Sequence, residues 1–291
     1  MYTTIQELIK TATREGRKIS YVAKRLEAKE LETTEEELTK SMRERFKVMK
    51  KSIETGLTQD LQSMSGLTGT EGKKFWKYIP NSITGKPVAE AIARAMAVGN
   101  VNASMGRIVA APTAGASGIL PAVILTVGEL FKRSEGEMVD SLFTAGAIGK
   151  VIAIRASLSG AEGGCQAECG SAAAMAAGAA VELAGGSPHQ VGDAVALALK
   201  SIMGLVCDPV AGLVEVPCIK RNGILASMAI SVADLSLAGI RSVIPADEVI
   251  DAMKSVGEML PNELKETALG GVATTPTAKE IEKNLKEVSP K

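Results

Sequence analysis

The sequence has few aromatic residues, one histidine, few cysteines and no net charge. Phe, Trp and Tyr make up 3% of its 291 residues, and 33 Lys and Arg are balanced by 33 Asp and Glu. So few rings argue against a stacking platform for bases or sugars. The missing basic excess argues against nucleic-acid binding as the main task. Four cysteines are too few for a secreted disulfide scaffold.

Neither a secretory leader nor a membrane span is expected. Residues 1–18 are polar and charged and contain no apolar stretch of the kind that a signal peptide needs. Residues 108–127 carry no charge and have the length of a membrane span. Pro112, Gly115, Ser117 and Pro121 would interrupt a lipid-facing helix in this stretch. We therefore predict a buried core segment here, in a protein without membrane contact.

What the sequence does contain is apolar residues and glycine. Hydrophobic residues make up 46% of the chain, and 29 residues are Gly, which excludes intrinsic disorder and predicts a core built from small and aliphatic side chains. Charged residues are concentrated towards the two ends. We predict a single domain over 1–291, with a charged, amphipathic helical arm at 1–58, a core at 59–270 and a polar tail at 271–291.

Periodicity and capping signals predict an all-α fold. Thr34 and Glu37 have the spacing of a capping box, and Ser187, Pro188 and Gln190 form a second helix start. Alternating strand patterns are nearly absent. The segment from Gly56 to Pro87 is rich in Gly, Ser and Thr, which indicates a connection between arm and core. The expected helices begin near Ile5 and after Thr34 and cover Val88–Val98, Ser171–Ala184, 187 to about 205, Asn222–Leu237 and part of the last twenty residues.

All four cysteines lie between positions 165 and 218, each in a Gly- or Pro-rich context. Thiolates in such loops are typical ligands of an iron–sulfur cluster, and their softness favours iron–sulfur or zinc over magnesium or calcium. Buried thiols that act as small hydrophobic groups are the alternative. Structural zinc is also open, although no C-x2-C pair occurs and His189 is the only histidine. Cys165 and Cys169 would share a helical face, so both could bind metal.

A second candidate site is the small-residue segment from Ala111 to Pro121, which predicts a loop that opens a helix. Free amides at a helix N-terminus bind anions, so a carboxylate could be held there with hydroxyl donors from Thr113 and Ser117. The pattern is neither a Walker P-loop nor G-x-G-x-x-G, and a simple tight turn between helices is the alternative. The candidate substrate-binding residues are Thr113, Ala114, Gly115, Ala116, Ser117 and Gly118.

The remaining polar residues near these motifs have structural explanations as well. His189 follows a helix cap, which predicts a solvated side chain rather than a catalytic base. Asp208 is expected to shape the turn beside Cys207. Lys220, Arg221 and Asn222 could hold a substrate or cluster sulfurs, and they could equally form a solvated helix start.

Three segments together resemble the α subunit of iron–sulfur-dependent L-serine dehydratase (L-serine ammonia-lyase). They are APTAGASGILPAV at 111–123, SGAEGGCQAECGSA at 159–172 and CDPVAGLVEVPCIKRN at 207–222. The family's three cluster cysteines are separated by 41 and 10 residues, and Cys165, Cys207 and Cys218 have the same spacing. The resemblance implies that these three hold a [4Fe–4S] cluster, whereas Cys169 falls outside the pattern and is expected to be a buried structural thiol.

Two features of single-chain members of this family are missing from the sequence. These are a Ser-Ser-His-Thr segment and a terminal Cys that reaches the cluster. The chain therefore resembles the two-subunit type, in which a separate β subunit supplies the missing domain and a regulatory module. The resemblance implies a cytoplasmic enzyme with this β subunit as its partner.

The resemblance also implies the reaction. A cluster iron without a protein ligand would act as a Lewis acid on the hydroxyl of L-serine, and the product would decompose to pyruvate and ammonia without pyridoxal phosphate. The loop at 111–118 would hold the substrate carboxylate. The sequence does not identify the base, which we expect from the partner subunit. The alternatives are an L-cysteine desulfidase with the same type of cluster and a non-enzymatic iron–sulfur or zinc module.

Overall fold

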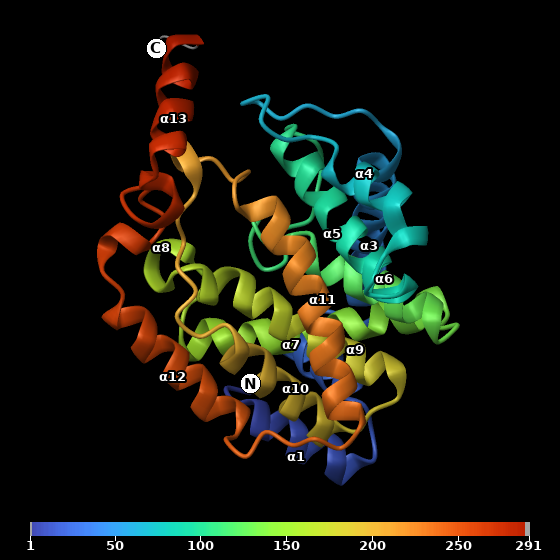
Figure 1. The fold of residues 1–291 in the computed structure, drawn as a ribbon. Helices are drawn as coiled ribbons and strands as arrows, with labels where there is room; N and C mark the ends of the chain where they lie inside the picture. The colour runs from blue at the N-terminus through green and yellow to red at the C-terminus, as the bar shows by residue number, and fades with distance from the viewer. Residues whose placement is uncertain (1, 289–291) are drawn as a thin grey trace.

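The computed structural model describes residues 2–288 and confirms an all-α fold. No β-strand occurs in this range, and the only extended pairing is an isolated bridge between Cys207 and Lys265. Short 3-10 or π turns lie at Ile79–Asn81, Gln166–Gly170 (η2), Val210–Gly212, Asn262–Leu264 and Gly271–Thr274. The helices, shown in Figure 1, are α1 (Ile5–Glu15), α2 (Ile19–Glu30), α3 (Glu35–Thr58), α4 (Glu71–Tyr78), α5 (Lys86–Ala103), α6 (Ile119–Leu130), α7 (Glu135–Arg155), α8 (Gly160–Gly163), α9 (Ser171–Ala184), α10 (Pro188–Ser201), α11 (Cys218–Leu237), α12 (Ala246–Met259) and α13 (Pro276–Val288).

Local capping chemistry explains where several of these helices begin. Both predicted caps are confirmed: Thr34 and Glu37 form a capping box at the start of α3, and Ser187 and Gln190 form one at α10. A third box at Ser134 begins α7. The predicted helix at Ser171–Ala184 coincides with α9. These starts are encoded within four residues of sequence, which is why the pattern finds them.

The structure differs from several of these expectations, and the helix expected at Val88–Val98 is longer, from Lys86 to Ala103. The connection at 56–87 contains α4, which Gly72 anchors by donating its N–H to Asn100 Oδ1 at 3.0 Å. Helix α10 ends at Ser201 rather than near 205, since Gly204 turns at φ +87° and donates its N–H to Gln166 Oε1. Helix α11 begins at Cys218, four residues before the expected start.

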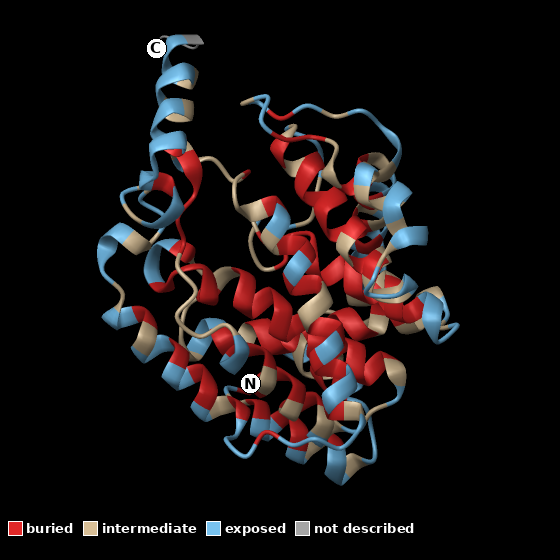
Figure 2. Ribbon diagram, in the orientation of Figure 1, coloured by how far each residue is buried: buried red, intermediate tan, exposed pale blue. Residues whose placement is uncertain are grey.

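The centre of the molecule is α9, which is buried along almost its whole length (Figure 2). Its Ala and Gly side chains let α6, α7, α10 and α11 pack directly against it. The core around it is continuous and also includes residues of α1 and α2, from the segment predicted as an arm. The division of the chain into arm, core and tail stays a prediction. Helix α13 extends away from the body, at the C-terminal end of the chain (Figure 1).

The uncharged segment at 108–127 lies partly in this core. Residues 116–124 are buried, whereas the loop before them is partly exposed. Within residues 2–288, no helix combines the length and hydrophobicity needed to cross a bilayer.

Helices α6, α9 and α11 also pack against one another. Each of them begins directly after a candidate motif: α6 after the loop at 113–118, α9 after Cys165 and Cys169, and α11 at Cys218. Contacts between these motifs, described below, bring the three N-terminal ends together. The fold therefore collects motifs that are far apart in the sequence at one place.

The close helix packing yields a matched pair of glycine substitutions. In α3, a Cβ at Gly56 would lie 2.2 Å from the carbonyl oxygen of Ala97, so Gly56→Ala should destabilise the protein by about 1–3 kcal/mol or more. In α7, a Cβ at Gly146 would meet no atom within 4 Å. Gly146→Ala should therefore stabilise it by about 0.5–1 kcal/mol through helix propensity. Urea unfolding of both variants measures the two effects, and equal stabilities would contradict this packing.

Candidate active site

The four cysteines predicted to include the metal ligands lie close together in the structure. The sulfur atoms of Cys165 and Cys169 and a carboxylate oxygen of Glu168 are all within 4.8 Å of one another, a group that could hold a metal ion. The Cys207 thiol is near enough to Cys165 for each to shift the pKa of the other. Cys218, at the start of α11, is near enough for the charge of Cys165 to affect its titration. None of the four is in a disulfide.

The mutual contacts of the thiols make their titration unequal. Hydrogen bonds from Cys169 and Cys207 lower the pKa of Cys165 to about 3, and the nearby Arg221 guanidinium acts in the same direction. The same hydrogen bonds, together with burial, raise the pKa values of Cys169 and Cys207 above their ordinary range. Burial raises the pKa of Cys218 to about 12. The site therefore stabilises one thiolate strongly, through its neighbours.

A buried glutamine fixes the turn that carries Cys165 and Cys169. This turn, η2, is π-helical, a geometry that is often found at functional sites. Gln166 is fully buried, and its amide donates to the carbonyl oxygens of Gly163 and Met253. Its Oε1 accepts from Gly204 N at 2.8 Å. Because every polar atom of this side chain is bonded, the turn is held against α12 and against the chain that leads to Cys207.

The segment after α12 fixes the backbone of Cys207. Cys207 N donates to the Leu264 carbonyl at 2.9 Å, and Glu266 N donates to the Cys207 carbonyl at 2.8 Å. Asp208, which is 2% exposed, accepts from Val272 N at 2.8 Å. Asp208 therefore joins the Cys207 loop to the segment after α12, and its role in shaping the turn stays a prediction. The strand-like pairing of 264–266 with Cys207 explains the isolated bridge.

Asp208 also forms a buried ion pair with Arg221. Arg221 Nη2 lies 2.8 Å from Asp208 Oδ1, and Arg221 Nη1 donates to the Val206 carbonyl at 3.0 Å. The side chains are 18% and 3% exposed. Arg221 thus joins the first turn of α11 to the Cys207 loop and places a positive charge beside the thiols.

Asn222 joins the loop at 113–118 to the start of α11. Its amide nitrogen donates to the carbonyls of Gly115 and Cys218, and its Oδ1 accepts from Gly118 N at 2.9 Å. Asn222 is 1% exposed. Of the two alternatives for this residue, the solvated helix start is excluded, because the Asn222 amide bridges two buried segments.

The loop at 113–118 does precede a helix, as predicted, but its amides are used differently. Gly118 N, at the start of α6, is already bonded to Asn222. Among the described residues, no hydrogen-bond partner is found for the N–H groups of Thr113, Ala114 and Gly115. The Ser117 hydroxyl is buried and has no partner in the same range. The loop therefore has several hydrogen-bond donors without a partner within one short segment, and these could bind a ligand.

Glu168 is the residue that the sequence analysis missed. Its carboxylate accepts a hydrogen bond from the Thr113 hydroxyl, and burial raises its pKa to about 7. It lies next to the candidate loop and between two cysteines. The available signal was a single charged residue within the small, uncharged run from Gly163 to Met175, where an acid is costly unless it has a partner.

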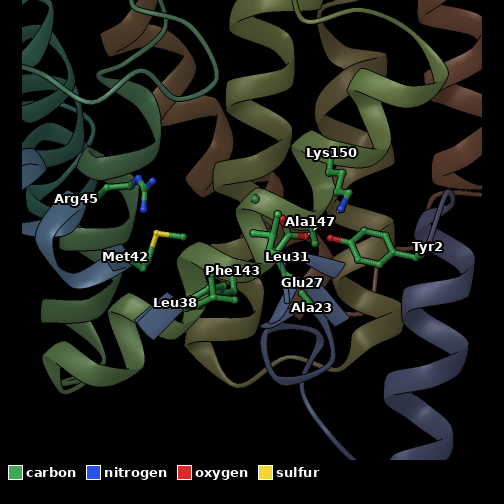
Figure 3. A pocket seen from close by; sticks show the side chains of 11 residues that line it. Tyr2, Ala23, Glu27, Leu31, Leu38, Met42, Arg45, Phe143, Ala147 and Lys150 are labelled. Atoms are coloured by element: carbon green, nitrogen blue, oxygen red, sulfur yellow. Dashed lines mark hydrogen bonds and ion pairs between the residues drawn. The ribbon is translucent and has the colours of Figure 1, made fainter. Parts of the chain in front are cut away.

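Other candidate groups lie elsewhere. His189 is exposed and lines a pocket with residues of α1, so it is not part of this site. Lys220 pairs with Glu71 at 2.8 Å. A pocket of about 250 Å³ between α2, α3 and α7 contains none of the predicted residues (Figure 3). The lysine in it, Lys150, is neutralised by Glu27 and Glu30.

Comparisons with known proteins agree over nearly the whole chain. Residues 14–273 match the family model described as serine dehydratase alpha chain. The chain is 47% identical to the probable L-serine dehydratase, alpha chain, of Bacillus subtilis, over 98% of this chain and 95% of that one. It is 42% identical to the L-serine dehydratase, alpha chain, of Peptoniphilus asaccharolyticus, over 99% of each. It is 39% identical to the L-serine dehydratase of Streptomyces coelicolor, over 94% of this chain and 60% of that protein.

The ion pair beside the thiols can be tested by its removal. Arg221→Met would leave Asp208 buried without its charged partner, so it should lower the free energy of unfolding by about 3–5 kcal/mol. The double variant with Asp208→Asn should recover part of this loss, because no buried charge then remains unpaired. Urea unfolding of the single and double variants gives the comparison. A loss below about 1 kcal/mol in the single variant would show that the pair is not held as described.

Proposed function

The chain belongs to the serine dehydratase alpha chain family, and we propose that it is the catalytic α subunit of an L-serine dehydratase. This lyase removes water from L-serine to form aminoacrylate, which tautomerises to an imine and takes up water to give pyruvate and ammonia. The observation that supports this assignment best is the meeting of the thiols with the loop at 113–118. A small substrate held by that loop would lie beside the cysteines.

A [4Fe–4S] cluster is the cofactor that we propose for the thiols. Cys165, Cys207 and Cys218 are the ligands, and Cys169 is a structural thiol. Glycine provides room beside them, since a Cβ at Gly160 would lie 3.1 Å from Cys207 Sγ. Soft thiol donors, this room and the positive charge of Arg221 all fit a cluster that carries negative charge. When bound, it supplies a Lewis acid for the hydroxyl of serine, otherwise a poor leaving group.

The chain's own residues bind and orient the substrate. The free amides of Thr113, Ala114 and Gly115 donate to the substrate carboxylate, and the start of α6 favours its negative charge. Ser117 and Ala116 line the same segment, and Gly118 keeps it fixed through Asn222. Holding the carboxylate at one point places the α-carbon in a defined position relative to the thiols.

The group that removes the α-proton comes from a partner in this proposal. The only histidine, His189, is remote from the site. The Bacillus subtilis and Peptoniphilus asaccharolyticus alpha chains match 98% and 99% of this chain, whereas this chain spans 60% of the longer Streptomyces protein. A separate β subunit, with a regulatory domain, would supply the remaining part and the base. The oxygen-sensitive thiol site suits a reducing cytoplasm.

The ligand assignment predicts what happens to the cluster when each cysteine is replaced by alanine. Cys165→Ala, Cys207→Ala or Cys218→Ala should remove the absorbance near 400 nm of the anaerobically purified protein, because each takes away one of three ligands. Cys169→Ala is the matched control and should keep this absorbance. Loss of the absorbance in Cys169→Ala alone would overturn the assignment. Zinc in place of iron, measured by metal analysis, would instead support a structural module.

The role of the loop predicts a steric effect at Gly115. A Cβ there would lie 2.6 Å from Glu168 Oε1 and 3.1 Å from Val214 Cγ1, so Gly115→Ala should displace the loop and raise KM for L-serine about tenfold or more. The absorbance near 400 nm should stay. Gly136→Ala, whose Cβ would meet only the Ser134 hydroxyl at 3.9 Å, is the control. An unchanged KM in Gly115→Ala would exclude the loop from substrate binding.

The activity itself is tested by anaerobic assays with and without the partner subunit. Pyruvate release from L-serine by the complex supports the proposal, and sulfide release from L-cysteine as the preferred reaction would assign a desulfidase instead. Full turnover by the isolated, reconstituted chain would contradict the assignment of the base to the partner.

A further inference from the structure

Glu168 is a half-buried carboxylate that has no cationic partner. Among residues 2–288, no Lys or Arg lies within ion-pair distance of it. The nearest guanidinium that affects the site, Arg221, is occupied by Asp208 and the Val206 carbonyl. The Glu168 carboxylate accepts a hydrogen bond from the Thr113 hydroxyl. A buried carboxylate without a positive partner is costly, so this position is explained best by a cation that is not part of the chain.

Two glycines keep space open beside this carboxylate. A Cβ at Gly115 would lie 2.6 Å from Oε1, and a Cβ at Gly160 would lie 3.2 Å from Oε2. Each oxygen therefore has a glycine beside it, and Oε1 also accepts the hydrogen bond from the Thr113 hydroxyl. The second acid near this space, Glu266, has its Oε2 3.1 Å from the same Cβ position at Gly160, and its side chain is exposed. Negative potential is thus concentrated beside the loop that holds the substrate.

The proposed substrate is an α-amino acid, which carries a carboxylate, a hydroxyl and an ammonium group. The loop amides account for the carboxylate and the thiol-held cofactor for the hydroxyl, so no group has yet been assigned to the ammonium. We propose that the Glu168 carboxylate binds the substrate ammonium group and is thereby the residue that selects α-amino acids over hydroxy acids. This inference rests on the proposed function, because it concerns the same site.

The loop amides, the thiol-held cofactor and the Glu168 carboxylate would each hold one group of the substrate, and three such contacts would define its stereochemistry. The Thr113 hydroxyl orients the Glu168 carboxylate, and Thr113 also begins the loop whose amides hold the substrate carboxylate. The two charged ends of the amino acid are therefore recognised by groups that are bonded to each other. A charge-assisted bond of this kind is about twice as strong as a neutral one, and a ligand without the ammonium would leave Glu168 unpaired.

The test compares L-serine with 3-hydroxypropanoate, which differs from it only by lacking the ammonium group. In the anaerobic complex with the partner subunit, Glu168→Gln should raise KM for L-serine about tenfold or more. The inhibition constant of 3-hydroxypropanoate should stay within about threefold, because Gln leaves an oxygen that accepts from Thr113 and has no charge to leave unpaired. Glu162→Gln, an exposed acid bonded to Ser157, is the matched control and should change neither constant.

Several outcomes would overturn the inference. An unchanged KM for L-serine in Glu168→Gln would exclude ammonium binding, and equal weakening of both ligands would indicate that Glu168 only holds the loop. If Glu168→Gln loses the absorbance near 400 nm, the Glu168→Asp variant tests the inference instead. It keeps the negative charge, so it should still prefer L-serine over 3-hydroxypropanoate. If Glu168→Asp keeps the absorbance but no longer prefers L-serine, the inference that Glu168 binds the ammonium group is also contradicted. No pyruvate release by the unsubstituted complex would overturn the proposed function itself, which separates the two failures.

Discussion

The packing of α6, α9 and α11 against one another is the constraint on which the site depends. These helices begin at Ile119, Ser171 and Cys218, and each start directly follows or contains a functional motif. Small side chains on the buried α9 allow the neighbouring helices to approach closely. The contacts between these motifs then bring the starts of three helices to one place.

Buried polar side chains with hydrogen-bond or ion-pair partners also hold the site together. Gln166 joins the Cys165 turn to α12 and to the chain before Cys207, and Asn222 joins the loop at 113–118 to α11. The Asp208–Arg221 pair joins α11 to the Cys207 loop. Such bonds have a direction, unlike contacts between alanine residues, so they define where the cysteines lie. Glu168 differs from these residues, because its charge has no partner in the described chain.

This contrast explains how the site combines stability with function. Gln166, Asn222 and Asp208, which hold the structure around the thiols, are paired with other groups of the chain. The free amides of the loop at 113–115 and the charge of Glu168 lack such partners in the described chain and have opposite polarity. An amino acid has the complementary pair of charges, whereas a simple hydroxy acid has only one of them.

The sequence by itself determined the helices with local signals and the identity of the candidate ligands. The capping boxes at Thr34 and Ser187 and the Ala-rich stretch of α9 lie within a few residues, so their signals do not depend on distant contacts. Cysteine spacing and the motifs at 111–123 and 207–222 indicated the family that the comparisons confirmed.

Only the tertiary structure decided how these motifs meet. Helix α4 is anchored by the bond from Gly72 to Asn100, and the chain after α10 is turned where Gly204 bonds to Gln166. The partner of Glu168, Thr113, is 55 residues away in the sequence. Periodicity describes one helix at a time and contains no information on which buried polar groups will face each other. Those pairings follow from the packing of whole helices, and they are what places a carboxylate, free amides and thiols around one small volume.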